Sequence, residues 1–253
     1  MEPWQLVAIM MSLALASYIQ TLTGFAFGLI VMGLLATLDV LPIESAALLC
    51  TLLGLFNNGM AMRGHWREIN PRLARRLLVT SLPMLPVGYF LAVWLGSERA
   101  PLLGMLLGIV ILIACLALLA QPGPRATTSP RRHFHTAGVL SGLMGGLFAA
   151  NGPPLVVVLY RQPMTLIAIR CTLFGVFIVT GIVRMGLSIA APGRIGDTLP
   201  QLLLVGLSGA LVVMLFTELA RRFPPPLSDN RLRQVAYAIL LVSSVNLIIK
   251  GLI

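Results

Sequence analysis

The chain has 253 residues, of which 58% are hydrophobic and 10% are charged, and its mean hydropathy is +0.94. Soluble domains carry about 25% charged residues, so this composition excludes a soluble domain and indicates an all-α polytopic membrane protein. The net charge of +10 does not point to a nucleic-acid partner, because 17 of the 18 basic residues are Arg and most lie in short loops. Such loops are retained in the cytoplasm of membrane proteins.

The first apolar run, 3–38, is too long for one membrane span, which needs about 20 residues. It lacks the basic segment and the small-residue cleavage site of a signal peptide, so we expect it to remain in the mature protein. Apolar runs follow at 42–62, 77–96, 100–120, 134–160, 164–191, 198–221 and 231–252.

The arginines predict which side of the membrane each loop faces. The segments Arg63–Arg76, Pro122–His133 and Arg221–Arg233 are rich in Arg and should be cytoplasmic. Counting spans back from the last of them requires 134–160 to begin and end on one face. Its 27 residues are too few for two spans, so it should be a hairpin. The same count predicts that both chain termini are periplasmic, in a bacterial inner membrane.

A shift of the chain against itself by 121 positions brings two similar segments together. "CTLLGLF" (50–56) then falls on "CTLFGVF" (171–177), and the shift also pairs Gly24 with Gly145 and Arg63 with Arg184. These matches predict two homologous halves, residues 1–120 and 134–253, joined by a cytoplasmic linker at 121–133.

The duplicated loops carry opposite charge biases, since Arg63–Arg76 holds five arginines and the matching segment 184–197 holds two. This difference predicts two repeats of inverted topology, as in many secondary transporters. Each repeat should open with a broken or re-entrant helical hairpin, followed by three spanning helices.

The run 134–160 is interrupted by the helix-breaking sequence Asn-Gly-Pro-Pro at 151–154. One interpretation is a kink whose carbonyls are satisfied by neighbouring helices. The other, which we favour, is a half-helix starting at the prolines, where the Gly152 amide and the Asn151 side chain donate to an anion. A helix N-terminus carries about half a positive charge, which suits an anionic group.

Two stretches carry a resemblance to a known family. "TGFAFGLIVMGLL" (23–35), and "SGLMGGLFAANGPPLVVVLYRQP" (141–163) followed by "IRCTLFG" (169–175), resemble the TauE/SafE family of sulfite and organosulfonate exporters. The likeness covers about residues 5–250. It implies an inner-membrane permease that exports small anions such as sulfite, sulfoacetate or related sulfonates. The first half departs from the pattern, because Ile30–Gly33 stand where the second half has Asn-Gly-Pro-Pro.

The predicted substrate site combines the two breaks with polar residues of the following runs. Arg170 lies seven residues beyond Pro163, about 10 Å into its helix. It is either the counter-charge of the anion or a side chain that reaches the membrane surface. The other expected site residues are Gln20, Thr21, Thr23, Gly24, Phe25, Asn57, Gly145, Gly146, Asn151, Gly152 and Pro153.

Each of these residues also has a structural alternative. The threonines can bond the carbonyl four residues before them, and the glycines and Asn57 can serve helix–helix packing. Arg63 and Arg184 are interpreted as anchors at the membrane surface, with a gating role as the lesser alternative.

No enzyme, cofactor or metal is expected. The histidines lie in loops without Asp or Cys at ligand spacing, and ATP-binding and hydrolase motifs are missing from the sequence. The expected partners are a small anion and the lipid bilayer, and a homodimer stays an open alternative. A carboxylate permease and a membrane subunit that does not transport are the competing functions.

Overall fold

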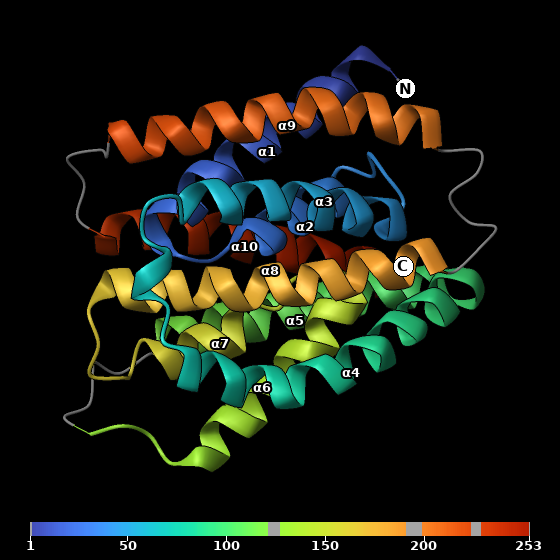
Figure 1. Ribbon diagram of the computed structural model, residues 1–253. Coiled ribbons are helices and arrows are strands. Elements are labelled where there is room, and N and C mark those ends of the chain that lie inside the picture. The colour runs from blue at the N-terminus through green and yellow to red at the C-terminus, as the bar shows by residue number, and fades with distance from the viewer. Residues whose placement is uncertain (1, 121–126, 191–198, 224–228, 253) are drawn as a thin grey trace.

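The computed structural model describes residues 2–120, 127–190, 199–223 and 229–252, with only the backbone described at 199–203, 229–233 and 235. These described residues form ten α-helices and one short 3-10 helix, without a strand (Figure 1). The α-helices are α1 (Pro3–Thr23), α2 (Phe27–Thr37), α3 (Ile43–Ala61), α4 (Pro71–Glu98), α5 (Ala100–Leu119), α6 (Arg131–Phe148), α7 (Gly152–Leu159), α8 (Leu166–Ala190), α9 (Leu199–Arg222) and α10 (Asp229–Leu252).

Five helices of the described chain are long and apolar enough to cross a membrane: α1, α4, α5, α8 and the Leu204–Arg222 part of α9. The predicted class of an all-α polytopic membrane protein is therefore confirmed. Helix α6 begins at Arg131, which is three residues earlier than the sequence predicted, so the end of the expected linker 121–133 is helical.

Two of the predicted apolar runs are broken into hairpins. Helices α1 and α2 are separated at Gly24–Ala26, and α6 and α7 are separated at Ala149–Asn151. At the first break Gly24 and Ala26 have φ of 81° and 88°, and at the second Ala149 has φ of 53°. The left-handed region is costly for residues with a side chain and is retained where the surrounding structure enforces it.

The two breaks are further apart in the chain than the internal repeat suggested. From Gly24 to Ala149 is 149 − 24 = 125 residues, which is four more than the shift of 121. The pairing of Gly24 with Gly145 is therefore displaced by about one helical turn. At the first break, the residues that begin the second half-helix are Ala26–Leu29, not Ile30–Gly33.

Helices α4 and α6 form a tight parallel pair. Gly138, Gly142 and Gly146 recur every four residues on α6 and face the carbonyls of Leu77, Ser81 and Leu85, which recur every four residues on α4. A Cβ atom on Gly138 would lie 2.6 Å from the Leu77 carbonyl oxygen. Small residues at this spacing allow helix backbones in membranes to approach closely.

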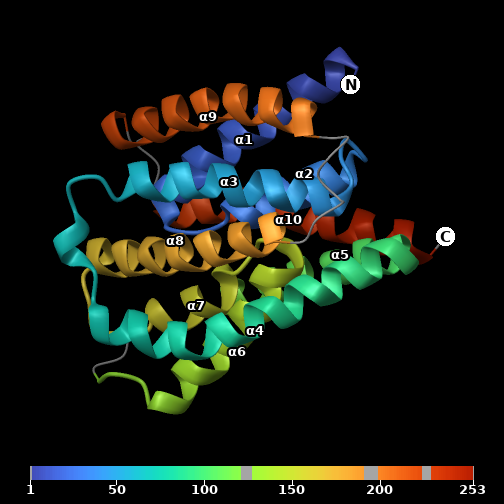
Figure 2. The same cartoon turned by 45° about the vertical axis from the view of Figure 1, so that its right-hand side comes forward.

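The other long helices also pack in pairs. Helices α3 and α8 run antiparallel, as do α5 and α10, and α1 packs parallel to α9 on the side opposite to α4 and α6 (Figures 1 and 2). The Tyr18 hydroxyl, near the end of α1, donates to the carbonyl of Phe223, the residue after α9, at 3.3 Å.

The described Arg-rich segments gather at one end of the helices. The Arg221 guanidinium donates to the Arg63 carbonyl at 3.1 Å, and Arg72 and Arg131 border one cavity. Both chain termini lie at the other end (Figure 1). The Arg-rich segments thus share one face, as the sequence predicted.

Candidate functional site

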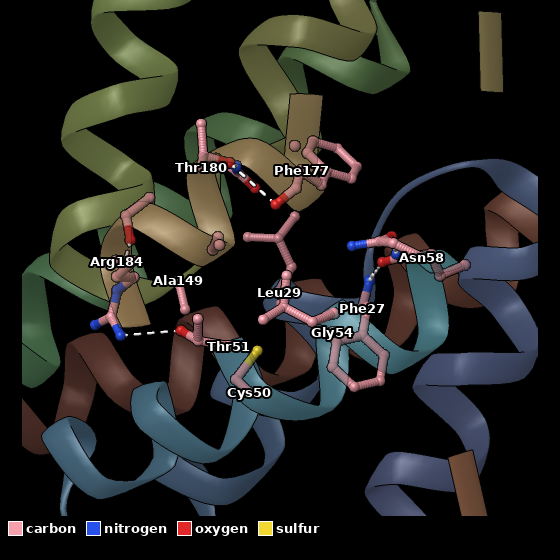
Figure 3. A pocket seen from close by; sticks show the side chains of 18 of the residues that line it. Phe27, Leu29, Cys50, Thr51, Gly54, Asn58, Ala149, Phe177, Thr180 and Arg184 are labelled. Atoms are coloured by element: carbon pink, nitrogen blue, oxygen red, sulfur yellow. Dashed lines mark hydrogen bonds between the residues drawn. The ribbon is translucent and has the colours of Figure 1, made fainter. Parts of the chain in front are cut away.

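A cavity lies where the two breaks meet, between α3 and α8 (Figure 3). Its volume is about 60 Å³, measured as the space open to the centres of water molecules. One water needs about 10–15 Å³ by that measure, so the cavity holds a few waters or one small solute. It is lined by Gln20, Ala26, Phe27, Gly28, Leu29, Cys50, Thr51, Gly54, Leu55, Asn58, Leu85, Gly145, Ala149, Ala150, Asn151, Gly152, Pro153, Phe177, Thr180, Gly181 and Arg184.

The breaks touch each other at Gly28, in the first turn of α2. A Cβ atom on Gly28 would lie 3.1 Å from the Ala150 Cα and closer still to the Ala149 carbonyl oxygen. Backbone atoms cannot rotate aside as a side chain can, so this position needs glycine.

Arg184 of α8 lies at one end of the cavity and is 5% exposed. Its Nε donates to the Gly145 carbonyl at 2.9 Å, and Nη2 donates to the Gly146 carbonyl at 3.3 Å. On the other side, Nη1 donates to the Thr51 hydroxyl at 3.0 Å and to the Ala47 carbonyl at 3.3 Å. Its guanidinium also lies 5.7 Å from the centre of the Tyr89 ring. Arg184 therefore joins α3, α4, α6 and α8.

The hydrogen bonds of Arg184 do not neutralise its charge. Among the described residues, no carboxylate forms a salt bridge with it. Two of its acceptors are carbonyls in the last turn of α6, where the helix dipole supplies only a partial negative charge. A buried cation without an ionised partner is costly unless another negative group completes the site. The geometry can thus stabilise an anion at this end of the cavity.

The opposite end of the cavity is neutral and polar (Figure 3). The Gln20 Nε2 donates to the Asn58 Oδ1 at 2.5 Å, and the Gln20 Oε1 accepts from the Phe27 amide at 2.8 Å. Gln20 therefore satisfies the first amide of α2 from the neighbouring helix. Because that amide is already hydrogen-bonded, the N-terminus of α2 has one donor fewer for a ligand.

The start of α7 contributes few amides, because Pro153 and Pro154 have no N–H. In its first turn only Gly152 and Leu155 carry donors among the four residues that have no partner within the helix. The Asn151 side chain donates to the Thr180 hydroxyl at 2.7 Å, and the Ser141 hydroxyl donates to the Asn151 carbonyl at 2.9 Å. These bonds fix the break against α6 and α8.

The cavity gathers five of the twelve expected site residues: Gln20, Gly145, Asn151, Gly152 and Pro153. Seven others are not among its lining residues: Thr21, Thr23, Gly24, Phe25, Asn57, Gly146 and Arg170.

Most of these seven have other contacts. The hydroxyls of Thr21 and Thr23 each donate to the carbonyl four residues before them at 2.7 Å. Gly146 packs on α4, and the Asn57 Oδ1 accepts from the Thr217 hydroxyl at 2.7 Å.

Arg170 lies behind the first break, outside the cavity lining. A Cβ atom on Gly24 would be 2.8 Å from the Arg170 Cγ and 3.3 Å from the Tyr160 hydroxyl oxygen. That hydroxyl donates to the Thr23 carbonyl at 2.5 Å. The Arg170 side chain therefore packs against the turn that connects α1 and α2.

Four polar side chains that α3 and α8 contribute to the cavity are not among the expected site residues: Thr51, Asn58, Thr180 and Arg184. From the sequence, Asn58 is interpreted as a pathway or helix-packing residue. The interpretation of Arg184 as an anchor at the membrane surface is wrong, because its side chain is buried. For Arg184 a signal was available. It lies seven residues before the end of the apolar run 164–191, about as deep as Arg170, which lies six residues from the start of that run. By depth in the run, Arg184 and Arg170 are equally strong candidates for the counter-charge of the anion.

Comparison with known proteins identifies a family. Residues 9–247 match the family described as "Sulfite exporter TauE/SafE". The chain is also 38% identical over 229 residues to the "Probable sulfite/organosulfonate exporter TauE" of Cupriavidus necator, an alignment that covers 90% of this chain and 88% of that protein. No solved structure matches the chain at a significant level. Because the match covers nearly all of the sequence, the chain belongs to the sulfite exporter TauE/SafE family of membrane transporters.

Proposed function

We propose that the protein exports small sulfur-containing anions, such as sulfite or sulfoacetate, across the bacterial inner membrane as a secondary transporter. The observation that carries this proposal is the buried Arg184 at the cavity, with no carboxylate bound to it among the described residues. Outward movement of an anion is favoured by an interior-negative potential, by about 2.3 kcal/mol per charge for each 100 mV.

The proposed substrate site is this cavity, with Arg184 in place of Arg170 as the counter-charge. The Gly152 amide is a further donor at its wall. The hydroxyls of Thr51 and Thr180 also line the wall, but each donates to the carbonyl four residues before it in its own helix. The small volume favours an anion of a few heavy atoms over a long organic sulfonate. A longer substrate would need the cavity to widen.

Alternating access by two inverted repeats, 1–120 and 134–253, is the proposed mechanism. A twofold rotation that exchanges the two halves places each helix on its counterpart. The counterparts are α1 and α6, α3 and α8, α4 and α9, and α5 and α10. The parallel pair α4–α6 then becomes the parallel pair α9–α1, and the contact of α3 with α9 becomes that of α8 with α4. The observed neighbours support a twofold relation between the halves.

The direction of the paired helices supports inversion. Helices related by a twofold axis along the membrane normal would run parallel to their mates. Helices α3 and α8 are antiparallel, as the contacts of Thr51 with Arg184 and of Leu55 with Gly181 require. Helices α5 and α10 are also antiparallel, because Gly108 meets Leu247 and Met105 meets Gly251. An axis in the membrane plane accounts for both pairs.

Flux measurements test the substrate class. Purified protein in vesicles should move sulfite and sulfoacetate at least tenfold faster than acetate. Equal rates for acetate would favour the alternative of a carboxylate permease. No flux of any of these anions, from protein shown to be folded and inserted, would favour the alternative of a subunit that does not transport.

Cysteine labelling tests the proposed topology, in which both termini are periplasmic. The three native cysteines are buried, so an impermeant thiol reagent should label the unmodified protein weakly. Gly193→Cys, which lies outside the described residues, should be labelled from the periplasm, and Arg67→Cys only after the membrane is opened. Labelling of both positions from the same side would contradict the inverted repeat.

A further inference from the structure

A second cavity lies at the Arg-rich end of the molecule, between the starts of α4 and α6. Its volume is about 520 Å³ by the same measure as above. It is lined by Pro71, Arg72, Arg75, Arg76, Val79, Arg131 and His135, which we call the basic cavity. Four of the seven residues are arginines and none is acidic.

Two helix N-termini add to this positive charge. Pro71 and Arg131 are the first residues of α4 and α6, and the two helices run parallel from this end (Figure 1). Parallel neighbours place their positive dipole ends side by side. The Asn70 side chain accepts from the Leu73 amide at 3.2 Å, so one donor of α4 is satisfied within the chain.

The basic cavity lies between two helices that pack backbone against backbone. The glycines of α6 press against the backbone of α4 just beyond it, and the Arg76 guanidinium lies 5.8 Å from the centre of the Phe134 ring. The helix starts that carry the arginines are thus held close together. An anion with several oxygen acceptors is suited to bridge such guanidinium groups.

Exposed apolar residues of α4 form a stripe that begins at the basic cavity. Val79 is 58% exposed and lines the cavity, and Val87, Phe90 and Trp94 follow with more than half of their surfaces exposed. From Val79 to Trp94 the stripe runs for about 22 Å along the helix. One leaflet of hydrocarbon is about 15 Å thick, so an acyl chain can lie along this stripe below a headgroup in the cavity.

We propose that the basic cavity binds the phosphate headgroup of an anionic phospholipid, with an acyl chain against the exposed stripe of α4. The continuity of charge and apolar surface selects a lipid over a soluble phosphate compound. Basic pockets between helices on the cytoplasmic side are suited to such headgroups. The site is separate from the transport cavity and does not depend on the identity of the transported anion.

Arginines in these loops are also expected because cytoplasmic loops are rich in positive charge. Two matched double variants distinguish this topological explanation from a lipid-binding site. Arg75→Gln with Arg131→Gln removes two charges from the basic cavity. Arg67→Gln with Arg132→Gln removes two charges from the same face at exposed positions that do not line it. A topological role predicts the same result for both.

The measurement is native mass spectrometry of delipidated protein after addition of phosphatidylglycerol or phosphatidylcholine. The unmodified protein and the control variant should retain phosphatidylglycerol at least fivefold more than phosphatidylcholine. The basic-cavity variant should lose this preference. If it fails to fold, the single exposed change Arg75→Gln should reduce the retention at least twofold.

Two results would overturn the proposal. Equal loss of phosphatidylglycerol in both double variants would reduce the effect to general surface charge. Full displacement of the lipid by millimolar glycerol phosphate would assign the cavity to a soluble anion. Sulfite flux in vesicles of neutral lipid is measured separately, so failure of the lipid site is distinguishable from failure of the transport proposal.

Discussion

Arg184→Met is expected to lower sulfite efflux from vesicles at least about 100-fold, equivalent to about 2.7 kcal/mol. The substitution removes the charge at the proposed substrate cavity and also the donor of four hydrogen bonds. A buried acceptor left unpaired costs about 1–3 kcal/mol, so the melting temperature in detergent should fall as well. Arg184→Lys keeps the charge but not the planar fork of donors, and should transport with a raised KM.

Arg170→Gln is the matched control, since it removes one positive charge from the same helix outside the cavity lining. It should change efflux by less than about threefold, which is about 0.7 kcal/mol. Loss of transport in Arg170→Gln, together with normal transport in Arg184→Met, would contradict the proposed site. It would return the role of counter-charge to Arg170.

The sequence could predict both hairpins, because their causes are local. The run 3–38 is too long for one span, Asn-Gly-Pro-Pro at 151–154 interrupts the run 134–160, and the loop sides predicted from the arginines require 134–160 to turn back. It could not predict that the breaks are 125 residues apart, because the strongest repeat signal lies in "CTLLGLF" and "CTLFGVF", in the helices that follow. An offset of one turn within a hairpin leaves that signal unchanged.

The expected residues that line the cavity all lie in a break or within four residues of one. Asn151, Gly152 and Pro153 line the cavity because the chain turns there. The place of Arg184 depends on the other half of the chain, since two of its hydrogen-bond acceptors, Ala47 and Thr51, are more than 130 positions away. Polarity and depth in a run do not say which neighbour a side chain meets. This long-range packing places Arg184, and not Arg170, at the cavity.

Gly28→Val is expected to abolish transport and to lower the melting temperature, because Gly28 is where the first break contacts the second. Its Cβ would press on the backbone at Ala149 and Ala150. Overpacking typically costs about 1–3 kcal/mol, and the β-branch adds a second group in the same space. Gly28→Ala should be milder in stability, so its efflux rate reports on the movement of the hairpins apart from folding.

Gly59→Ala is the control for Gly28, since a Cβ at Gly59 meets nothing within 4 Å. Alanine in place of a helical glycine is favourable by up to about 1 kcal/mol, so this variant should be at least as stable as the unmodified protein and should transport normally. The proposed alternating access requires the two hairpins to move relative to each other, and added bulk at Gly28 is expected to resist that movement. A folded Gly28→Ala with slower efflux, in which Gly59→Ala is unaffected, would tie transport to the contact of the breaks. Normal efflux in Gly28→Val would show that this contact is not made during the transport cycle, and the cavity between the breaks would lose its proposed role.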